Sequence, residues 1–256
     1  MRSLLPAHGP DPEAPGGLHA WYATPTRAWV RANMICSVDG AASVAGRSGG
    51  LGSSADRQVL STLRDHADVI LVGATTVRTE RYHSPDPSPG RRARRLADGR
   101  AEVPRLAVIG SPEGWTGQEG WIAAATAPPL LLTARARARD LDGVEVLTCG
   151  EERVSLDLAL DALAARGLVS VLCEGGPGIL SQLVATGRLQ ELCVSFAPML
   201  VGPGPHRIMS GEEWPAPMTA TLTAMLEDAG MLLCRYSLAG DPAAEATRSA
   251  LTTSGT

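Results

Sequence analysis

The sequence of 256 residues contains no lysine, so its 23 basic residues are all arginine. Any cation that binds a phosphate in this protein must therefore be a guanidinium group. Aromatic residues are also scarce, with five Trp, three Tyr and one Phe, and the formal net charge is −4. Proteins that bind nucleic acids normally present a basic surface and aromatic side chains for stacking. The composition therefore argues against a nucleic-acid partner.

Long apolar runs are missing as well. No stretch approaches the 18 or so uninterrupted apolar residues of a membrane span, and the amino terminus lacks the apolar core of a signal peptide. The five cysteines are odd in number and none has CxxC spacing. Each lies in an apolar run, which predicts reduced, buried thiols in a cytoplasmic protein. The His and Cys pattern matches no zinc motif, and we expect no metal site.

What remains is typical of a globular α/β protein. Short β-like runs, such as Ala28–Ser37 and Asp68–Gly73, alternate with helical patterns across residues 26–238. The pattern predicts one three-layer domain around a mostly parallel sheet. Its final strands are expected to be antiparallel and to meet at a tight turn over Asp228–Gly230. Ser54 is expected to cap the helix that follows the first Gly/Ser-rich loop.

Three segments do not fit the alternating pattern. Residues 1–25 and 239–256 are small, polar and without periodicity, and are predicted to be mobile tails. Residues 84–103 form an insertion rich in Pro and Arg, with the run RRARR at Arg91–Arg95. This insertion is either a solvated basic loop or a lid that binds a ligand phosphate.

Small residues gather at three predicted strand-to-helix junctions: Ser37–Gly52, Gly73–Thr76 and Glu174–Gly178. Helix amino termini present free N–H groups that favour phosphates, and loops at the carboxyl ends of parallel strands form the ligand crevice. Gly50–Ala55 matches G-x-G-x-x-A, but the next strand ends without the acidic residue that a Rossmann site requires. The junctions therefore predict a dinucleotide or sugar-phosphate site of another kind.

Four segments together resemble a known family. SVDG at Ser37–Gly40, LRDHADVILVGATTVRTE at Leu63–Glu80, VLCEGGPGIL at Val171–Leu180 and FAPMLVG at Phe196–Gly202 resemble the reductase domain of bacterial riboflavin biosynthesis. The resemblance covers roughly residues 28–238 and implies a dihydrofolate-reductase-like fold. It implies NADPH-dependent reduction of 5-amino-6-(5-phosphoribosylamino)uracil at ribose C1. The zinc deaminase that bifunctional relatives carry is not expected here.

The resemblance also implies roles for individual residues. Asp39 and Glu174 are the expected catalytic carboxylates, placed to stabilise positive charge. The expected substrate-binding residues are Asn33, Ser48, Arg64 and Glu174. The expected cofactor-binding residues are Ile35, Leu51, Gly73, Thr76, Glu80, Ser111, Gly175, Gly176, Pro177, Gly178, Ile179 and Leu180. An arginine, with Arg91–Arg95 as one source, is expected to join Ser111 at the 2′-phosphate of NADPH.

Two departures from the family pattern concern the substrate. Asn33 and Leu51 stand where relatives commonly have a lysine and a tryptophan. The alternatives are therefore a reductase of another heterocycle, such as a dihydropterin, and a catalytically silent NADP(H)-binding protein. The resemblance and the long apolar strands near the carboxyl terminus also predict a homodimer.

Overall fold

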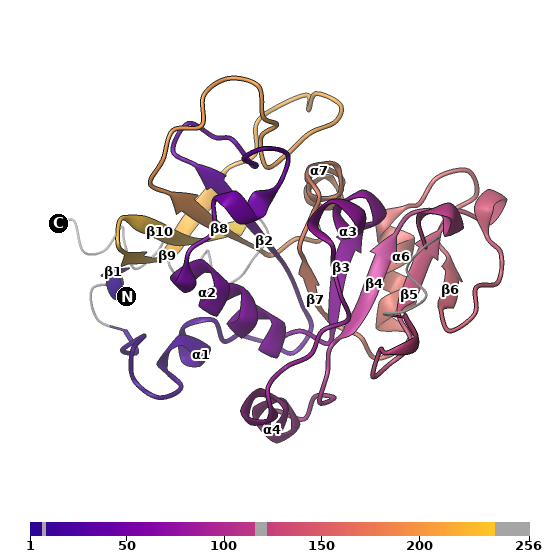
Figure 1. Ribbon diagram of the computed structural model, residues 1–256, viewed down its shortest axis with the longest axis horizontal. Helices are drawn as coiled ribbons and strands as arrows, with labels where there is room; N and C mark the ends of the chain where they lie inside the picture. Colours follow the sequence, from indigo (N-terminus) through magenta and orange to yellow (C-terminus); the bar gives the residue numbers. More distant parts are fainter. Residues whose placement is uncertain (7–8, 116–121, 239–256) are drawn as a thin grey trace.

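A computed structural model describes residues 1–6, 9–115 and 122–238. One ten-stranded sheet crosses the molecule in the order β1-β9-β10-β8-β2-β7-β3-β4-β5-β6 (Figure 1). The neighbours from β8 to β6 are parallel, whereas β10, β9 and β1 pair antiparallel. This arrangement confirms the predicted α/β fold with a mostly parallel sheet and antiparallel carboxyl-terminal strands.

The strands are β1 (Arg2–Leu5), β2 (Trp29–Ser37), β3 (Val69–Gly73), β4 (Arg105–Ile109), β5 (Leu130–Thr133), β6 (Glu145–Thr148), β7 (Ser170–Cys173), β8 (Glu191–Ala197), β9 (Ala220–Asp228) and β10 (Met231–Leu238). The α-helices are α1 (Gly17–Trp21), α2 (Ser54–Asp65), α3 (Ala74–Glu80), α4 (Pro89–Ala97), α6 (Leu156–Ala164) and α7 (Pro177–Ala185). Short 3-10 turns η1 (Ser48–Gly50), η2 (Pro112–Trp115) and η3 (Arg135–Arg137) join them.

Successive side chains of the central strands point to opposite faces of the sheet, and helices cover both faces, which produces three layers. In β3, Val69 and Leu71 pack with α6 and α7 on one face, while Ile70 and Val72 pack with α3 on the other. The helices α1 and α2 cover the neighbouring part of that second face. Because both faces are covered, β3 is apolar along its whole length, as parallel strands usually are.

Local signals place the elements that carry the site. The helix α2 begins after Ser53, whose hydroxyl accepts from the N–H of Asp56 at 3.1 Å. The sequence predicted Ser54 as the capping residue. This prediction is wrong by one residue, because Ser54 is already the first residue of the helix. The β9–β10 hairpin turns at Ala229 and Gly230, with φ values of 48° and 84°. Two consecutive positive φ angles define the tight turn predicted over Asp228–Gly230.

The amino-terminal segment differs from the predicted mobile tail over residues 1–25. Arg2–Leu5 forms β1 and pairs with β9, and Trp21 and Tyr22 at the end of α1 are buried. The prediction is wrong because it weighed the local polarity of this segment and overlooked its buried aromatics. The predicted tail over residues 239–256 lies outside the described residues.

The Arg/Pro-rich insertion over residues 84–103 is also not a loop throughout. Its centre forms α4, with Pro89 in the first turn, beyond the carboxyl end of α2 (Figure 1). Arg95 is only 1% exposed, so the insertion is anchored in the protein rather than solvated. The five cysteines are free and buried, as predicted. Among the described residues, no helix is both long and apolar enough to cross a membrane.

Candidate functional site

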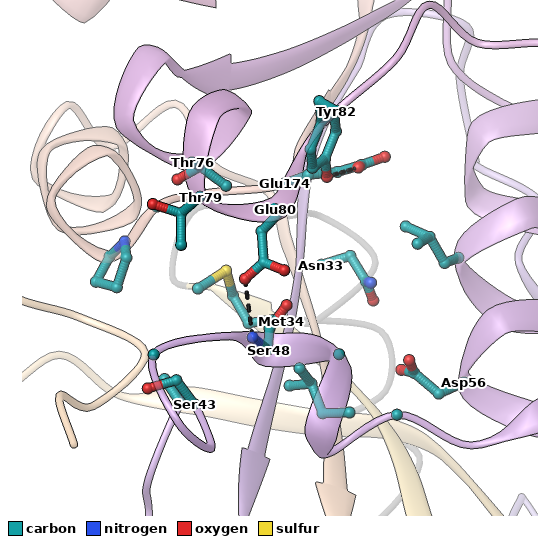
Figure 2. Close-up of a pocket in the computed structure, with 18 of the residues that line it drawn as sticks. Asn33, Met34, Ser43, Ser48, Asp56, Thr76, Thr79, Glu80, Tyr82 and Glu174 are labelled. Carbon is teal, nitrogen blue, oxygen red and sulfur yellow. Dashed lines mark hydrogen bonds between the residues drawn. The ribbon is translucent and has the colours of Figure 1, made fainter.

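A cavity of about 460 Å³ opens between β2, η1, α2 and α3, where the central parallel strands end. We call it the central cavity. It brings together residues from all three predicted junctions (Figure 2). The predicted site residues that line it are Asn33, Ile35, Ser48, Thr76, Glu80, Glu174, Gly176 and Pro177.

Glu174 forms the buried wall of the central cavity. Its side chain is 2% exposed and accepts two hydrogen bonds from Arg64, at 2.7 Å from Nε and 2.6 Å from Nη2. The hydroxyl of Tyr82 donates a third, short hydrogen bond to the same carboxylate. Burial and the nearby Glu174 raise the pKa of Tyr82 well above its usual value, so Tyr82 stays a donor. A bidentate guanidinium fixes the orientation of this carboxylate.

Glu80 lines the same cavity from the end of α3. Its Oε1 accepts from the backbone N–H of Ser48 at 2.8 Å, which ties η1 to the end of α3 (Figure 2). A further carboxylate, Asp56, lines the same cavity from α2, and burial raises its pKa. Asn33 lies on β2 with its Oδ1 buried and without a hydrogen-bond partner in the described part of the chain. The lining from β2 and α2 therefore includes two acceptor oxygens, of Asn33 and Asp56, beside the cationic Arg57.

Glycine is required where β3 and β7 meet α7. A Cβ on Gly176 would lie 2.8 Å from the hydroxyl of Thr76, and one on Gly73 would lie 2.8 Å from Cδ1 of Ile179. Gly175 has a φ of 86°, a backbone conformation that side chains rarely adopt. Within the described residues, no side chain caps α7. The junction is therefore narrow, and it presents a helix amino end to any ligand bound there.

A second cavity, of about 860 Å³, lies on the other side of α7 along the ends of β4 and β5. We call it the flanking cavity. Its lining includes Ser111, Arg137, Arg153, Gly178 and Trp214. Thr133 also lines it, fully buried, and its hydroxyl has no partner among the described residues. The amino end of α7 separates the two cavities, since Gly176 and Pro177 line one and Gly178 the other.

Comparison with known proteins assigns this architecture to a family. Residues 28–231 match the model of the RibD C-terminal domain. The chain belongs to this family. It is 29% identical over 181 residues to a 2,5-diamino-6-ribosylamino-4(3H)-pyrimidinone 5′-phosphate reductase of Methanothermobacter thermautotrophicus, covering 69% of this chain and 80% of the relative. A riboflavin biosynthesis protein RibD of Bacillus amyloliquefaciens is 29% identical over 179 residues, which are 68% of this chain and 46% of that protein.

Solved structures agree with this assignment. A pyrimidine reductase-like protein from Corynebacterium diphtheriae superposes with a TM-score of 0.72 at 25% identity, covering 86% of this chain and 96% of that one. A riboflavin biosynthesis reductase of Saccharomyces cerevisiae shares the fold, with a TM-score of 0.59 at 20% identity, over 87% and 95% of the two chains. The predicted family resemblance is confirmed, and membership of the RibD C-terminal domain family makes this chain an oxidoreductase.

Several residues predicted for the site lie elsewhere. Asp39 is exposed outside both cavities, and its carboxylate accepts from Ser37 and from the N–H groups of Val201 and Gly202. These bonds lower its pKa and anchor a loop. Leu51 and Leu180 are buried in the core, at 1% and 0% exposure, so their side chains cannot reach a ligand. Both residues follow glycine-rich loops, and the sequence motifs did not show which side chains of these segments point into the core.

Arg64 also departs from its predicted place, because its guanidinium lies behind Glu174 and does not line the central cavity. The run Arg91–Arg95 lies at α4, near the amino ends of the strands (Figure 1), whereas Ser111 follows the carboxyl end of β4. It is therefore the wrong source for an arginine beside Ser111. Arg137 and Arg153 of the flanking cavity occupy that place instead.

Sequence reasoning missed several site residues of this RibD-type domain. Asp56 was interpreted only as a favourable charge in the first turn of a helix. Tyr82 follows α3 directly, and its position two residues after Glu80 was a usable signal. Thr133 ends β5, Arg137 follows β5 and Arg153 follows β6, all outside the four motifs. The general rule that ligands bind at the carboxyl ends of parallel strands would have indicated them.

Proposed function

We propose that this chain is an NADPH-dependent reductase of riboflavin biosynthesis that reduces 5-amino-6-(5-phosphoribosylamino)uracil at ribose C1. The observation that carries the proposal is the amino end of α7, which lies between two cavities beside the buried Glu174. One cavity is suited to a heterocycle, and the other to the adenosine end of a dinucleotide. The narrow glycine junction between them matches a pyrophosphate, which needs close approach to backbone N–H groups.

The flanking cavity supports NADPH rather than NADH. Arg137 and Arg153 line it beside Ser111, and neither forms an ion pair with a carboxylate in the described ranges. Their neighbours differ, since Arg135 pairs with Glu151 at 3.1 Å and Arg139 with Glu113 at 3.1 Å. Arg137 and Arg153 are therefore the cations available to a 2′-phosphate, whereas the hydroxyl of Ser111 already bonds the carboxylate of Glu113.

When bound, NADPH supplies the hydride that reduces ribose C1 in the ring-opened, imine form of the substrate. The residues of this chain orient the reactants and stabilise charge. Glu174, held by Arg64 and Tyr82, places a fixed negative charge on the wall of the central cavity, where it favours the cationic imine. Glu80 keeps η1 in position, and so closes the cavity on that side.

A second candidate substrate is the 2,5-diamino pyrimidinone named for the archaeal relative. Its 2-amino group is a hydrogen-bond donor where the uracil has a carbonyl acceptor. The buried Oδ1 of Asn33 and the carboxylate of Asp56, both acceptors on the central cavity, favour the diamino compound. Asp56→Asn should therefore lower kcat/KM for the diamino compound more than for the uracil.

The deciding experiment is turnover of the purified chain with NADPH and each pyrimidine, followed by loss of absorbance of the reduced nicotinamide. Consumption of either phosphoribosylamino-pyrimidine supports the proposal. Turnover of a dihydropterin alone would replace it with the second heterocycle class. Tight NADPH binding without turnover of any heterocycle would show a silent NADP(H)-binding protein.

The homodimer, expected from the family resemblance and the long apolar strands, and the cytoplasmic location, expected from the cysteine pattern, remain predictions. One argument for the dimer has changed, because β1 covers the edge of β9 that was expected to be open. The outer strands of the sheet are β1 and β6. Light scattering at micromolar concentration would measure the mass, and a monomer would contradict the prediction.

A further inference from the structure

The flanking cavity has one aromatic side chain among the described residues that line it, in a chain that is poor in aromatics. This residue is Trp214, on the connection between β8 and β9. Its side chain is partly buried and packs against the main apolar core. Ile109 and Val154 line the same cavity and are also partly buried against that core. The cavity therefore has an apolar part in addition to its two arginines.

The segment that carries Trp214 borders open space on two sides. Residues 210–214 line the flanking cavity, and together with Met209 they also line a further cavity of about 570 Å³. We call this further cavity the loop cavity. The N–H of Ser210 donates to the carbonyl of Pro177 at 3.3 Å, which ties the segment to the amino end of α7. The indole is therefore held beside the flanking cavity, with room for a flat ligand against it.

Charge separates the part of the flanking cavity near Trp214 from the part near the arginines. Glu212 and Glu213 precede Trp214 directly and line the same cavity, and neither forms an ion pair within the described ranges. Carboxylates repel a phosphate, whereas Arg137 and Arg153 attract one. A ligand with one anionic and one neutral, flat part would therefore direct its flat part toward Trp214.

We propose that Trp214 binds the adenine of the cofactor by stacking, beside the apolar side chains of Ile109 and Val154. The inference rests on the proposed function, because it takes NADPH as the occupant of the flanking cavity. An aromatic side chain that stacks on a base contributes about a tenfold or larger factor to affinity. Trp214 is then a cofactor-binding residue that lies outside the four sequence motifs, on a segment between β8 and β9.

The first test uses the full chain with adenosine 2′,5′-bisphosphate, which carries the adenine and the 2′-phosphate but no nicotinamide. Calorimetry measures its binding to the wild-type protein and to variants at Trp214. Trp214→Leu should weaken binding about tenfold, and Trp214→Phe less than about threefold, since phenylalanine keeps an aromatic face.

Met209→Ala is the matched control for this titration. Met209 lies on the same segment and packs against the same core, but it lines the loop cavity and not the flanking cavity. Its variant should bind the bisphosphate within about twofold of the wild-type affinity. No binding by the wild type, equal binding by Trp214→Leu, or an equal loss in Met209→Ala would each overturn the proposal.

Tryptophan fluorescence supplies a readout that does not depend on affinity. A saturating concentration of the bisphosphate should change the emission of the wild-type protein, because adenine contacts the indole. The same titration of Trp214→Phe should show no change, and a change that persists there would contradict the stacking.

Turnover of a pyrimidine with NADPH tests the proposed function separately. A wild-type protein that does not turn over any heterocycle, but binds the bisphosphate through Trp214, would reject the function and keep the adenine site. Turnover by Trp214→Leu with an unchanged KM for NADPH would keep the function and reject the adenine site.

Discussion

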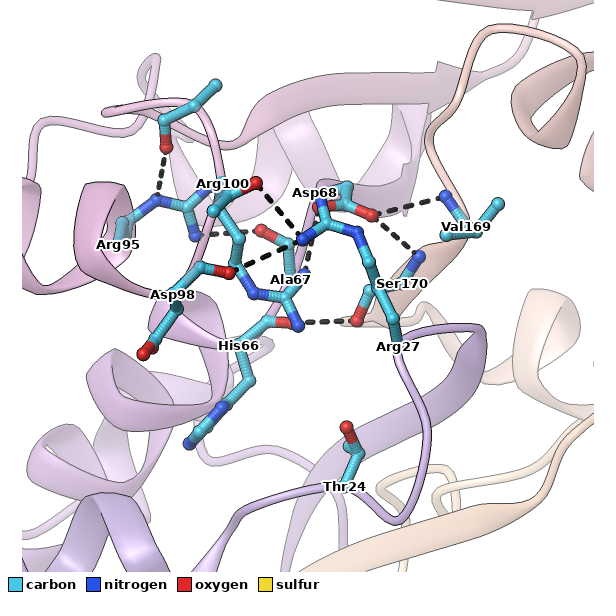
Figure 3. Close-up of polar contacts among 12 residues, drawn as sticks. Thr24, Arg27, His66, Ala67, Asp68, Arg95, Asp98, Arg100, Val169 and Ser170 are labelled. Atoms are coloured by element: carbon cyan, nitrogen blue, oxygen red, sulfur yellow. Dashed lines mark hydrogen bonds and ion pairs between the residues drawn. The ribbon is translucent and has the colours of Figure 1, made fainter.

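The two ends of the parallel sheet differ in how certain buried oxygens are bonded, although guanidinium nitrogens such as Nε of Arg100 also lack a partner in the described residues at the amino ends. At the amino ends, Asp68 accepts from Arg27 at 3.0 Å and Arg100 at 2.9 Å, and its other oxygen accepts from two backbone N–H groups (Figure 3). At the carboxyl ends, Asn33 Oδ1 and Thr133 Oγ1 are buried without partners in the described residues. Buried polar groups that bond one another hold a fold together, whereas those left unpaired are available to a ligand.

The largest effect should come from breaking the amino-end cluster. Asp68→Ala leaves Arg100, which is 8% exposed, without its carboxylate partner, so the free energy of unfolding should fall by about 3–5 kcal/mol. Urea denaturation measures the change. The control is Asp161→Ala, whose carboxylate is 65% exposed and pairs with Arg188, with an expected loss of under about 1 kcal/mol. Similar losses of unfolding free energy in both variants would show that the Asp68 cluster contributes no more stability than an exposed ion pair.

At the carboxyl ends of the strands, Glu174→Gln should lower kcat more than it weakens NADPH binding. The amide cannot supply the negative charge, so kcat should fall about a hundredfold, as when a preorganised charge-stabilising group is removed. The dissociation constant for NADPH should change less than about twofold, since the amide oxygen can still accept from Arg64, and urea denaturation of the variant measures the stability lost with the ion pair. Single-turnover kinetics and fluorescence titration of NADPH measure the two quantities.

Tyr82→Phe is a milder variant of the same site, because it removes one hydrogen-bond donor to Glu174 and leaves the carboxylate paired with Arg64. Its kcat should fall less than that of Glu174→Gln. If Glu174→Gln instead abolished NADPH binding, Glu174 would belong to the cofactor site. The stabilisation of the imine would then have to come from another group.

The unpaired arginines of the flanking cavity should affect cofactor choice. Arg137→Ala should raise KM for NADPH about tenfold and leave KM for NADH unchanged, because only NADPH carries the 2′-phosphate. Arg153→Ala should act in the same direction. Arg135→Ala and Arg139→Ala are the controls, since both arginines are paired with glutamates. A similar rise in all four variants would indicate a general electrostatic effect rather than a 2′-phosphate site.

The effect that is smallest at neutral pH concerns the pair of histidines at the amino-terminal segment. His66 stacks on His19 at 3.9 Å, and burial together with His19 lowers its pKa from 6.5 to about 3. Between these values the unfolded chain binds the proton and the native chain does not, so stability is lost as pH falls from 6.5 toward 3.

His66→Gln should remove up to about 1.4 kcal/mol per pH unit from that slope. Urea titrations at several pH values measure it. The control is His83→Gln, which replaces a histidine outside the His19–His66 pair and should leave the slope unchanged. An unchanged slope in His66→Gln would show that other groups govern the acid sensitivity.

The sequence predicted more of the fold than of the site. Apolar runs such as β3 and the hairpin residues Ala229 and Gly230 act locally, so their structure could be anticipated. Four motifs indicated the family and placed Glu174 and Thr76 on the central cavity. Asp39 was misassigned because an Asp-Gly pair after a strand is equally compatible with a loop anchor, and only the contacts with Val201 and Gly202 distinguish the two.

What the sequence by itself determined is the layer architecture, the family and the absence of lysine, which leaves every cationic contact to arginine. Which arginines are free was decided only by the tertiary structure. Arg135, Arg137 and Arg139 alternate in one short segment, yet among the described residues the outer two pair with glutamates and the middle one does not. Arg95 lies in a run that appeared solvated and is instead buried against backbone carbonyls. Ion pairing depends on distances between residues far apart in the chain, and local sequence does not encode those distances.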